Sequence, residues 1–308
     1  MKRFLNCTAS DFEKMNRTDF IAAIASGEGR VLVCETIGGI LPMLGDVTNA
    51  EFAAAMGADI ILLNVFDVNQ PVICGLPETA PEDTVKKLKE LTGRPIGINL
   101  EPLEHHAAKL MAGNHAAKLT AGRAATLENG LKAADMGVDF IVLTGNPGVG
   151  VTNQAIKDTL KLYRDHLGDR VVLAAGKMHA AGILSEAGEH IITREDVKDF
   201  ADAGADIILM PAPGTVPGIT VDDIKDLVSY AHQLGKLTLT AIGTSQEGAD
   251  TDTIKRIALM CKMTGTDLHH LGDAGYNGMA LPENILEYGK VIRGVRHTYH
   301  RMALSIRR

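Results

Sequence analysis

The stretch "AGADIILM", residues 203–210, places a glycine and an aspartate directly before a run of apolar residues. The same pattern recurs as "MGADIILL" (56–63), "MGVDFIVL" (136–143) and, with two histidines in the run, "TGTDLHHL" (264–271). Short, nearly continuous apolar runs are typical of parallel strands that are buried on both faces. The repeat therefore predicts four equivalent strands spread along the chain.

Four other apolar runs alternate with these, and each begins with a basic residue: "RVLVCETI" (30–37), "RPIGINLE" (94–101), "RVVLAAGK" (170–177) and "KLTLTAIG" (236–243). Helical patterns fill the gaps, and several end in glycine, a common helix stop. Eight strands, each followed by a helix, are typical of an α/β fold with a single closed (β/α)8 or TIM barrel. The alternation of two strand types favours this barrel over an open doubly wound sheet. We expect strands to begin near residues 30, 58, 95, 138, 170, 205, 236 and 266.

Charged residues at the strand starts would form a ring around the amino-terminal rim of this barrel. Basic residues precede the odd strands and acidic residues the even ones: Arg30, Asp59, Arg94, Asp139, Arg170, Asp206, Lys236 and Asp267. We interpret the ring as a belt of alternating charges that fixes strand register. Exposed ion pairs contribute only about 0 to 1 kcal/mol each, so the predicted role is structural.

The barrel leaves a short segment at each end of the chain. We expect residues 1–29 to form a helical extension packed on the barrel, with a helix near 17–26. The barrel itself is expected over 30–296, followed by a basic tail over 297–308. The tail is interpreted as the solvated face of a last helix or as a subunit contact, and we expect a homo-oligomer.

The composition, 45% hydrophobic and 22% charged over 308 residues, is ordinary for a soluble protein. A net charge of −7 argues against nucleic-acid binding. The sequence has no apolar run of the roughly 18 residues that a membrane helix needs. Its four cysteines form no CxxC pair, which indicates reduced thiols. We therefore expect a cytoplasmic protein without nucleic-acid or membrane partners.

Enzymes of this fold carry their chemistry at the carboxyl ends of the strands. Because side chains alternate in and out along a strand, counting from each starting charge identifies those that point into the mouth. Polar residues collect five and seven positions on, after nearly continuous apolar positions. We predict Glu35, Glu101 and Lys177 as catalytic. The predicted substrate-binding residues, some in the loops that follow, are Asn64, Asp67, Asn99, Thr144, Asn146 and His179.

Glycine-rich loops follow the seventh and eighth predicted strands, as "GTSQEG" (243–248) and "GDAGYNG" (272–278). Glycines let backbone N–H groups approach an anion, and many barrels bind phosphate at these two loops. The alternative is that the glycines only permit tight turns. We predict a phosphate cradle formed by Gly243, Thr244, Ser245, Gly272, Asp273, Ala274 and Gly275.

With these strand starts and glycine loops, the chain resembles the phosphate-binding (β/α)8 barrels, which include ribulose-phosphate epimerase and the isomerases of histidine and tryptophan biosynthesis. The resemblance implies a small phosphorylated metabolite as ligand. A second resemblance is to the phosphoenolpyruvate phosphonomutases, because "GDAGYNG" is similar to their Asp-x-x-Gly-Tyr-Gly loop. That loop stands earlier in the barrel of that family, so its metal and substrate roles are not carried over.

Two carboxylates and an amine at one mouth are suited to moving a proton beside a carbonyl group. We expect acid-base isomerisation or carbon-bond cleavage of a sugar phosphate or phospho-carboxylate, with Glu101 or Glu35 as the base. Lys177 would be the acid, an electrophile or a Schiff-base former. The alternatives are an ion pair of Glu101 with Lys177 or an arginine, and a non-catalytic barrel that binds a metabolite.

The long loops after the second, third and fifth strands are expected to rise over the mouth. They carry five histidines that could join the carboxylates around a metal ion: His105, His106, His115, His179 and His190. No HxH or HExxH spacing occurs, which disfavours a zinc hydrolase. Mg²⁺ leaves little trace in a sequence and is a candidate cofactor of a phosphonomutase- or hydrolase-like enzyme.

Overall fold

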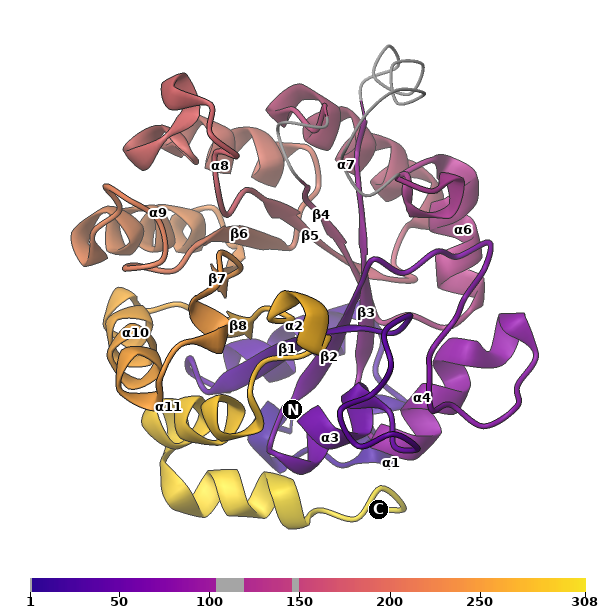
Figure 1. The fold of residues 1–308 in the computed structure, drawn as a ribbon. Helices are drawn as coiled ribbons and strands as arrows, with labels where there is room; N and C mark the ends of the chain where they lie inside the picture. Colours follow the sequence, from indigo (N-terminus) through magenta and orange to yellow (C-terminus); the bar gives the residue numbers. More distant parts are fainter. Residues whose placement is uncertain (1, 104–118, 146–149) are drawn as a thin grey trace.

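The computed structural model describes residues 2–103, 119–145 and 150–308, and within them parallel strands form a closed barrel in the order β1 to β8 (Figure 1). Each strand begins one or two residues after its predicted start. The strands are β1 (Val31–Ile37), β2 (Ile60–Asn64), β3 (Ile96–Leu100), β4 (Phe140–Leu143), β5 (Val172–Gly176), β6 (Ile207–Pro211), β7 (Leu237–Ile242) and β8 (Leu268–Leu271). The prediction of a TIM barrel is confirmed.

A helix follows each strand, and Figure 1 shows these helices around the outside of the barrel. In chain order they are α3 (Asn49–Ala55), α4 (Thr84–Thr92), α6 (Leu127–Asp135), α7 (Asn153–Leu167), α8 (Arg194–Asp202), α9 (Val221–Gln233), α10 (Thr251–Thr264) and α11 (Pro282–Ala303). Several begin after a threonine whose hydroxyl accepts a backbone N–H of the first turn, a common helix cap. These threonines are Thr48, Thr126, Thr193 and Thr220. No described helix has the length and apolar character needed to cross a membrane.

The amino-terminal extension closes one end of the barrel. It contains α1 (Ala9–Phe12) and α2 (Arg17–Ala25), close to the predicted helix at 17–26. Phe4, Phe20 and Ile24 belong to the same buried cluster as the inward-facing side chains of the strands, such as Val33 of β1. This cluster fills the barrel below the carboxyl ends of the strands.

The aspartate that precedes each even strand accepts a hydrogen bond from a backbone N–H of the odd strand before it. The four bonds are 2.7 to 3.0 Å long and run from the amides of Leu32, Ile96, Leu173 and Thr238 to Asp59, Asp139, Asp206 and Asp267. A buried backbone N–H needs an acceptor, and the carboxylate supplies one at this position. The repeated Gly-x-Asp pattern is therefore a repeated strand cap.

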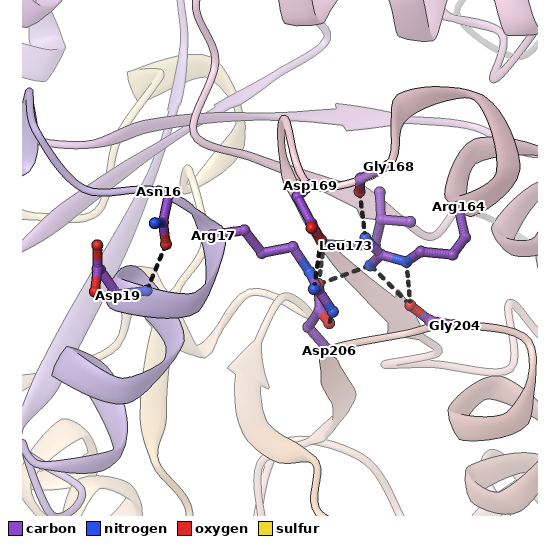
Figure 2. A network of polar contacts seen from close by, with 9 residues as sticks. All are labelled: Asn16, Arg17, Asp19, Arg164, Gly168, Asp169, Leu173, Gly204 and Asp206. Atoms are coloured by element: carbon purple, nitrogen blue, oxygen red, sulfur yellow. Dashed lines mark hydrogen bonds and ion pairs between the residues drawn. The ribbon is translucent and has the colours of Figure 1, made fainter.

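The basic partners of these aspartates come mainly from helices, which corrects the expected belt of alternating strand charges. Asp206 pairs with Arg17 of α2 and with Arg164 of α7, as Figure 2 shows. Arg17 also pairs with Asp169 at 2.8 Å. The ion pairs thus join the amino-terminal extension to the barrel rim.

The carboxy-terminal segment packs against the same rim. Helix α11 runs through the predicted boundary at 297, with a break at Gly294, whose φ is 75°. Arg293 and Arg301 both pair with Asp59, and the side chains of all three residues are at most 1% exposed. Arg293 and Arg301 thus anchor α11 to the rim, while Val295 and Tyr299 of the same helix are exposed.

Candidate active site

A cavity of about 300 Å³ lies at the carboxyl ends of the strands. Strands β1 to β4 and the residues just after them contribute Glu35, Asn64, Val65, Asn99, Glu101, Thr144 and Gly145. The remaining described lining comes from later loops: Arg123, Met178, His179, Gly243, Glu247 and Asp273. The polar mouth above an apolar interior is the arrangement expected from the period-two count.

A carboxyl pair occupies the part of this cavity where the barrel closes. Glu35 lies near the end of β1 and Asp273 follows β8, and both carboxyl groups line the cavity. The Asn64 amide donates to both groups, at 3.0 Å to Glu35 Oε1 and 3.0 Å to Asp273 Oδ2. The ring of the fully buried His270 lies on the other side of Glu35, with Nε2 at 3.2 Å from Oε2.

The two carboxyl groups differ in how readily they ionise. Burial and the adjacent Glu35 carboxylate raise the pKa of Asp273 to about 6. Burial opposes ionisation of Glu35 as well, but His270, followed by bonds from Asp273 and Asn64, lowers its pKa. Two carboxyl groups in contact titrate as a coupled pair that retains one proton more strongly than the other. Asp273 is therefore the group of the pair that binds a proton as the pH falls through about 6.

The loop after β8 orients Asp273. The Gly275 N–H donates to Asp273 Oδ1 at 2.7 Å, and Ala274 between them adopts a left-handed φ of 54°. The short turn η8 (Gly275–Asn277) begins there. The "GDAG" segment thus holds a carboxyl group toward Glu35.

Glu101, just beyond β3, is bound to an arginine. Its Oε1 lies 2.5 Å from Arg123, and its backbone N–H donates to the Arg123 carbonyl at 2.9 Å. Burial raises the pKa of Glu101 in spite of the nearby guanidinium. Of the alternatives left open by the sequence, the geometry places Glu101 in an ion pair with an arginine.

Lys177 is buried just after β5, but it is not among the described residues that line the cavity. The count from Arg170 is off by one, because an extra turn residue precedes β5: the Arg170 N–H bonds back to Leu167, where α7 ends. In the other odd strands the capped amide lies two residues after the starting charge, whereas in β5 it is Leu173, three residues after. Met178 and His179 take the lining positions instead.

Four of the six predicted substrate-binding residues line the cavity. Asn64, Asn99, Thr144 and His179 line the cavity, and burial lowers the pKa of His179. Asp67 is not in the described lining, because its carboxylate accepts the N–H groups of its own loop, from Asn69 at 2.7 Å and Gln70 at 3.1 Å. Asn146 lies outside the described residues.

The loop after β7 places a carboxylate where the sequence predicts phosphate. Glu247, in the turn η7 (Gln246–Gly248), is 6% exposed, and both of its oxygens accept the Ser245 N–H, at 3.2 and 3.0 Å. Burial and the nearby Asp273 raise the pKa of Glu247. Of the predicted phosphate residues, Gly243 and Asp273 line the cavity.

The described residues offer few metal ligands in one place. Within residues 2–103, 119–145 and 150–308, no group of three His, Cys, Asp or Glu side chains is arranged to hold a metal ion. Between Glu35 and Asp273 stands the N–H donor of Asn64, which is not a metal ligand. The described residues therefore contain no three-ligand metal centre. His105, His106 and His115 lie outside them, so Mg²⁺ stays a prediction.

Comparison with protein families gives one match over nearly the whole chain, since a family model described as a domain of unknown function (DUF7916) covers residues 5–308. The chain belongs to the DUF7916 family. No curated protein matches it.

Solved structures show that the DUF7916 barrel is similar to those of known enzymes. An archaeal fructose 1,6-bisphosphate aldolase matches with a TM-score of 0.57 and 12% identity, over 91% of this chain and 100% of the other. A 2,3-dimethylmalate lyase, described as a PEP mutase/isocitrate lyase superfamily member, matches with a TM-score of 0.50 and 11% identity, over 84% and 81%. The carboxyl transferase domain of Rhizobium etli pyruvate carboxylase matches with a TM-score of 0.53 and 12% identity. This match covers 97% of the present chain and 52% of the pyruvate carboxylase chain, so the present chain spans about half of the other's length. Identities this low establish the fold alone.

Proposed function

We propose that the protein is a small-molecule enzyme of the lyase or isomerase type whose proton-transfer centre is the Glu35–Asp273 pair. The Asn64 amide, which donates a hydrogen bond to both carboxyl groups at the wall of the cavity, carries the proposal because it holds the two groups together. The barrel similarity to an aldolase and to a 2,3-dimethylmalate lyase agrees with this reaction class.

Asp273 is the group that exchanges the proton. A general acid-base residue works best when its pKa lies near the working pH, and that of Asp273 is about 6. In its ionised form it accepts a proton from a carbon beside a carbonyl, or from a hydroxyl during aldol-type cleavage. The electron pair released from the C–H or C–C bond stays on the carbonyl fragment as an enolate. Protonated Asp273 then returns the proton to carbon, so the enzyme is unchanged.

The other lining groups have supporting roles in this proposal. Glu35 remains ionised between His270 and Asn64, and its charge keeps the Asp273 carboxylate basic. Arg123 and the neutral form of His179 line the same cavity and are positioned to donate hydrogen bonds to the enolate oxygen. Glu101 holds Arg123 in place. Catalytic roles for Glu101 and Lys177 themselves stay predictions.

The test is proton exchange in D₂O with a panel of small hydroxy-aldehydes and hydroxy-ketones, followed by NMR. We expect the wild-type protein to incorporate deuterium beside the carbonyl of at least one compound, and Asp273→Asn to do so about 100-fold or more slowly. Binding of a panel compound without exchange or turnover would support the non-catalytic barrel instead.

A further inference from the structure

The loop between β7 and α10 already contains an anion of its own. Both oxygens of the Glu247 carboxylate accept the Ser245 N–H, and the Glu247 backbone N–H also bonds to its own carboxylate. Ser245 adopts a left-handed φ of 91° in this turn. Such a concave set of amides is a common binding site for phosphate and other anions.

Three further donors of the predicted phosphate cradle also have acceptors inside the chain. The Thr244 hydroxyl donates to the carbonyl of Thr215 at 2.7 Å. The Gly272 N–H donates to the Ile242 carbonyl at 2.8 Å. The Gly275 N–H is held by Asp273. A phosphate that bound these three donors would therefore have to displace existing hydrogen bonds.

The charges around the cavity disfavour a phosphate as well. Its described lining includes four carboxyl groups, those of Glu35, Glu101, Glu247 and Asp273, but a single arginine, which is already paired with Glu101. Even with the nearby Lys177 counted, carboxyl groups outnumber cationic side chains by four to two. Like charges at close range repel most strongly where water is scarce.

We propose that Glu247 makes this cavity selective against phosphorylated ligands, because its carboxylate occupies the anion position of the loop after β7. The substrate is then an uncharged hydroxy-carbonyl compound, whose hydroxyl groups can donate to the carboxylates. This inference rests on the proposed function, since it names the substrate class of the same cavity. It departs from the phosphorylated metabolite that the sequence predicts.

Thermal unfolding of the full chain tests the inference, with inorganic phosphate as the probe and sodium chloride at equal ionic strength as the reference. We compare the wild type with Glu247→Gln, which removes the charge but keeps the size, and with Glu247→Ala, which also vacates the site. Glu189→Gln removes an exposed carboxylate outside the described cavity lining and is the matched control.

We expect phosphate to leave the unfolding midpoints of the wild type and Glu189→Gln unchanged. It should raise that of at least one Glu247 variant by about 2 °C or more, with saturation. A phosphate-specific rise in the wild type would overturn the inference, and so would the absence of a rise in both Glu247 variants. If Glu247→Ala fails to fold, Glu247→Gln decides alone.

A second assay separates this inference from the proposed function. Glyceraldehyde and dihydroxyacetone are each paired with their phosphate esters in the D₂O exchange experiment. Exchange of an ester by the wild type that is lost in Asp273→Asn would overturn the selectivity and leave the proton-transfer centre standing. Exchange of an unphosphorylated compound at least 10-fold faster than its ester supports both proposals. Absence of exchange counts against the proposed function, while the phosphate titration still decides the role of Glu247.

Discussion

Glu35 and Asp273 both accept a hydrogen bond from the Asn64 amide, at 3.0 Å each, although they lie near opposite ends of the chain. The contact exists because the barrel closes: β1 pairs with β8, in a register that places Cys34 beside Leu271. Glu35 is the first residue after Cys34, and Asp273 is the second residue after Leu271. Closure of the barrel therefore brings the two carboxyl groups together, and the following predictions concern the consequences.

The rate of the proposed reaction should fall as the pH drops below about 6, because Asp273 must be ionised to accept a proton. Glu35→Gln removes the negative charge that raises the pKa of Asp273, so the acidic limb should move to lower pH by about half a unit or more. The pH dependence of kcat/KM in both proteins measures the shift. An unchanged acidic limb in Glu35→Gln would mean that the two groups do not titrate together.

Asp273→Asn should have a larger free energy of unfolding than the wild type at pH 7.5. A carboxyl group whose pKa is raised by folding contributes stability when protonated, and that contribution is lost as pH rises from its unfolded value of about 4 through its folded value of about 6. The amide removes this cost, with an expected gain of about 1 to 2 kcal/mol. Urea unfolding at pH 7.5 measures it, and the gain should be absent at pH 4. A variant that is less stable than the wild type at pH 7.5 would contradict the destabilising effect of the ionised Asp273.

Arg301→Met should destabilise the protein by about 3 kcal/mol, because it leaves the buried Asp59 with one ion-pair partner fewer. Arg307→Met is the matched control, since Arg307 is exposed near the carboxy terminus. Urea unfolding of the two variants gives the difference. Equal stabilities would mean that the ion pair of Arg301 with Asp59 does not stabilise the fold.

We expect Lys177 not to form a Schiff base, because Met178 and His179 take the lining positions after β5. Borohydride reduction in the presence of glyceraldehyde or dihydroxyacetone, followed by peptide mass spectrometry, should modify Lys177 no more than the exposed Lys198. Selective modification of Lys177 would restore its predicted catalytic role.

The barrel could be predicted from the sequence because two simple regularities specify it. Continuous apolar runs mark buried parallel strands, and the Gly-x-Asp repeat sets their register. The same count from the strand starts identified Glu35, Asn64, Asn99 and Thr144, because β1 to β4 are regular up to the rim. The fold and the residues at the strand ends could thus be predicted from the local sequence pattern.

The residues that the count missed depend on loops. One extra turn residue before β5 shifted the position of Lys177. Arg123 lies far from Glu101 along the chain, after the long segment that follows β3. Nothing in the sequence pattern therefore predicted their ion pair. Glu247 stood inside the predicted phosphate loop, but the glycines and hydroxyls of that loop suggested an external anion and not an internal one.

The role of Asp273 as proton carrier is tested most directly by deuterium exchange from D₂O into hydroxy-aldehydes and hydroxy-ketones, compared between the wild type, Asp273→Asn and Glu189→Gln. The account predicts exchange by the wild type and by Glu189→Gln, and exchange about 100-fold or more slower in a folded Asp273→Asn. Exchange by Asp273→Asn at a rate close to that of the wild type would show that the proton moves through another group.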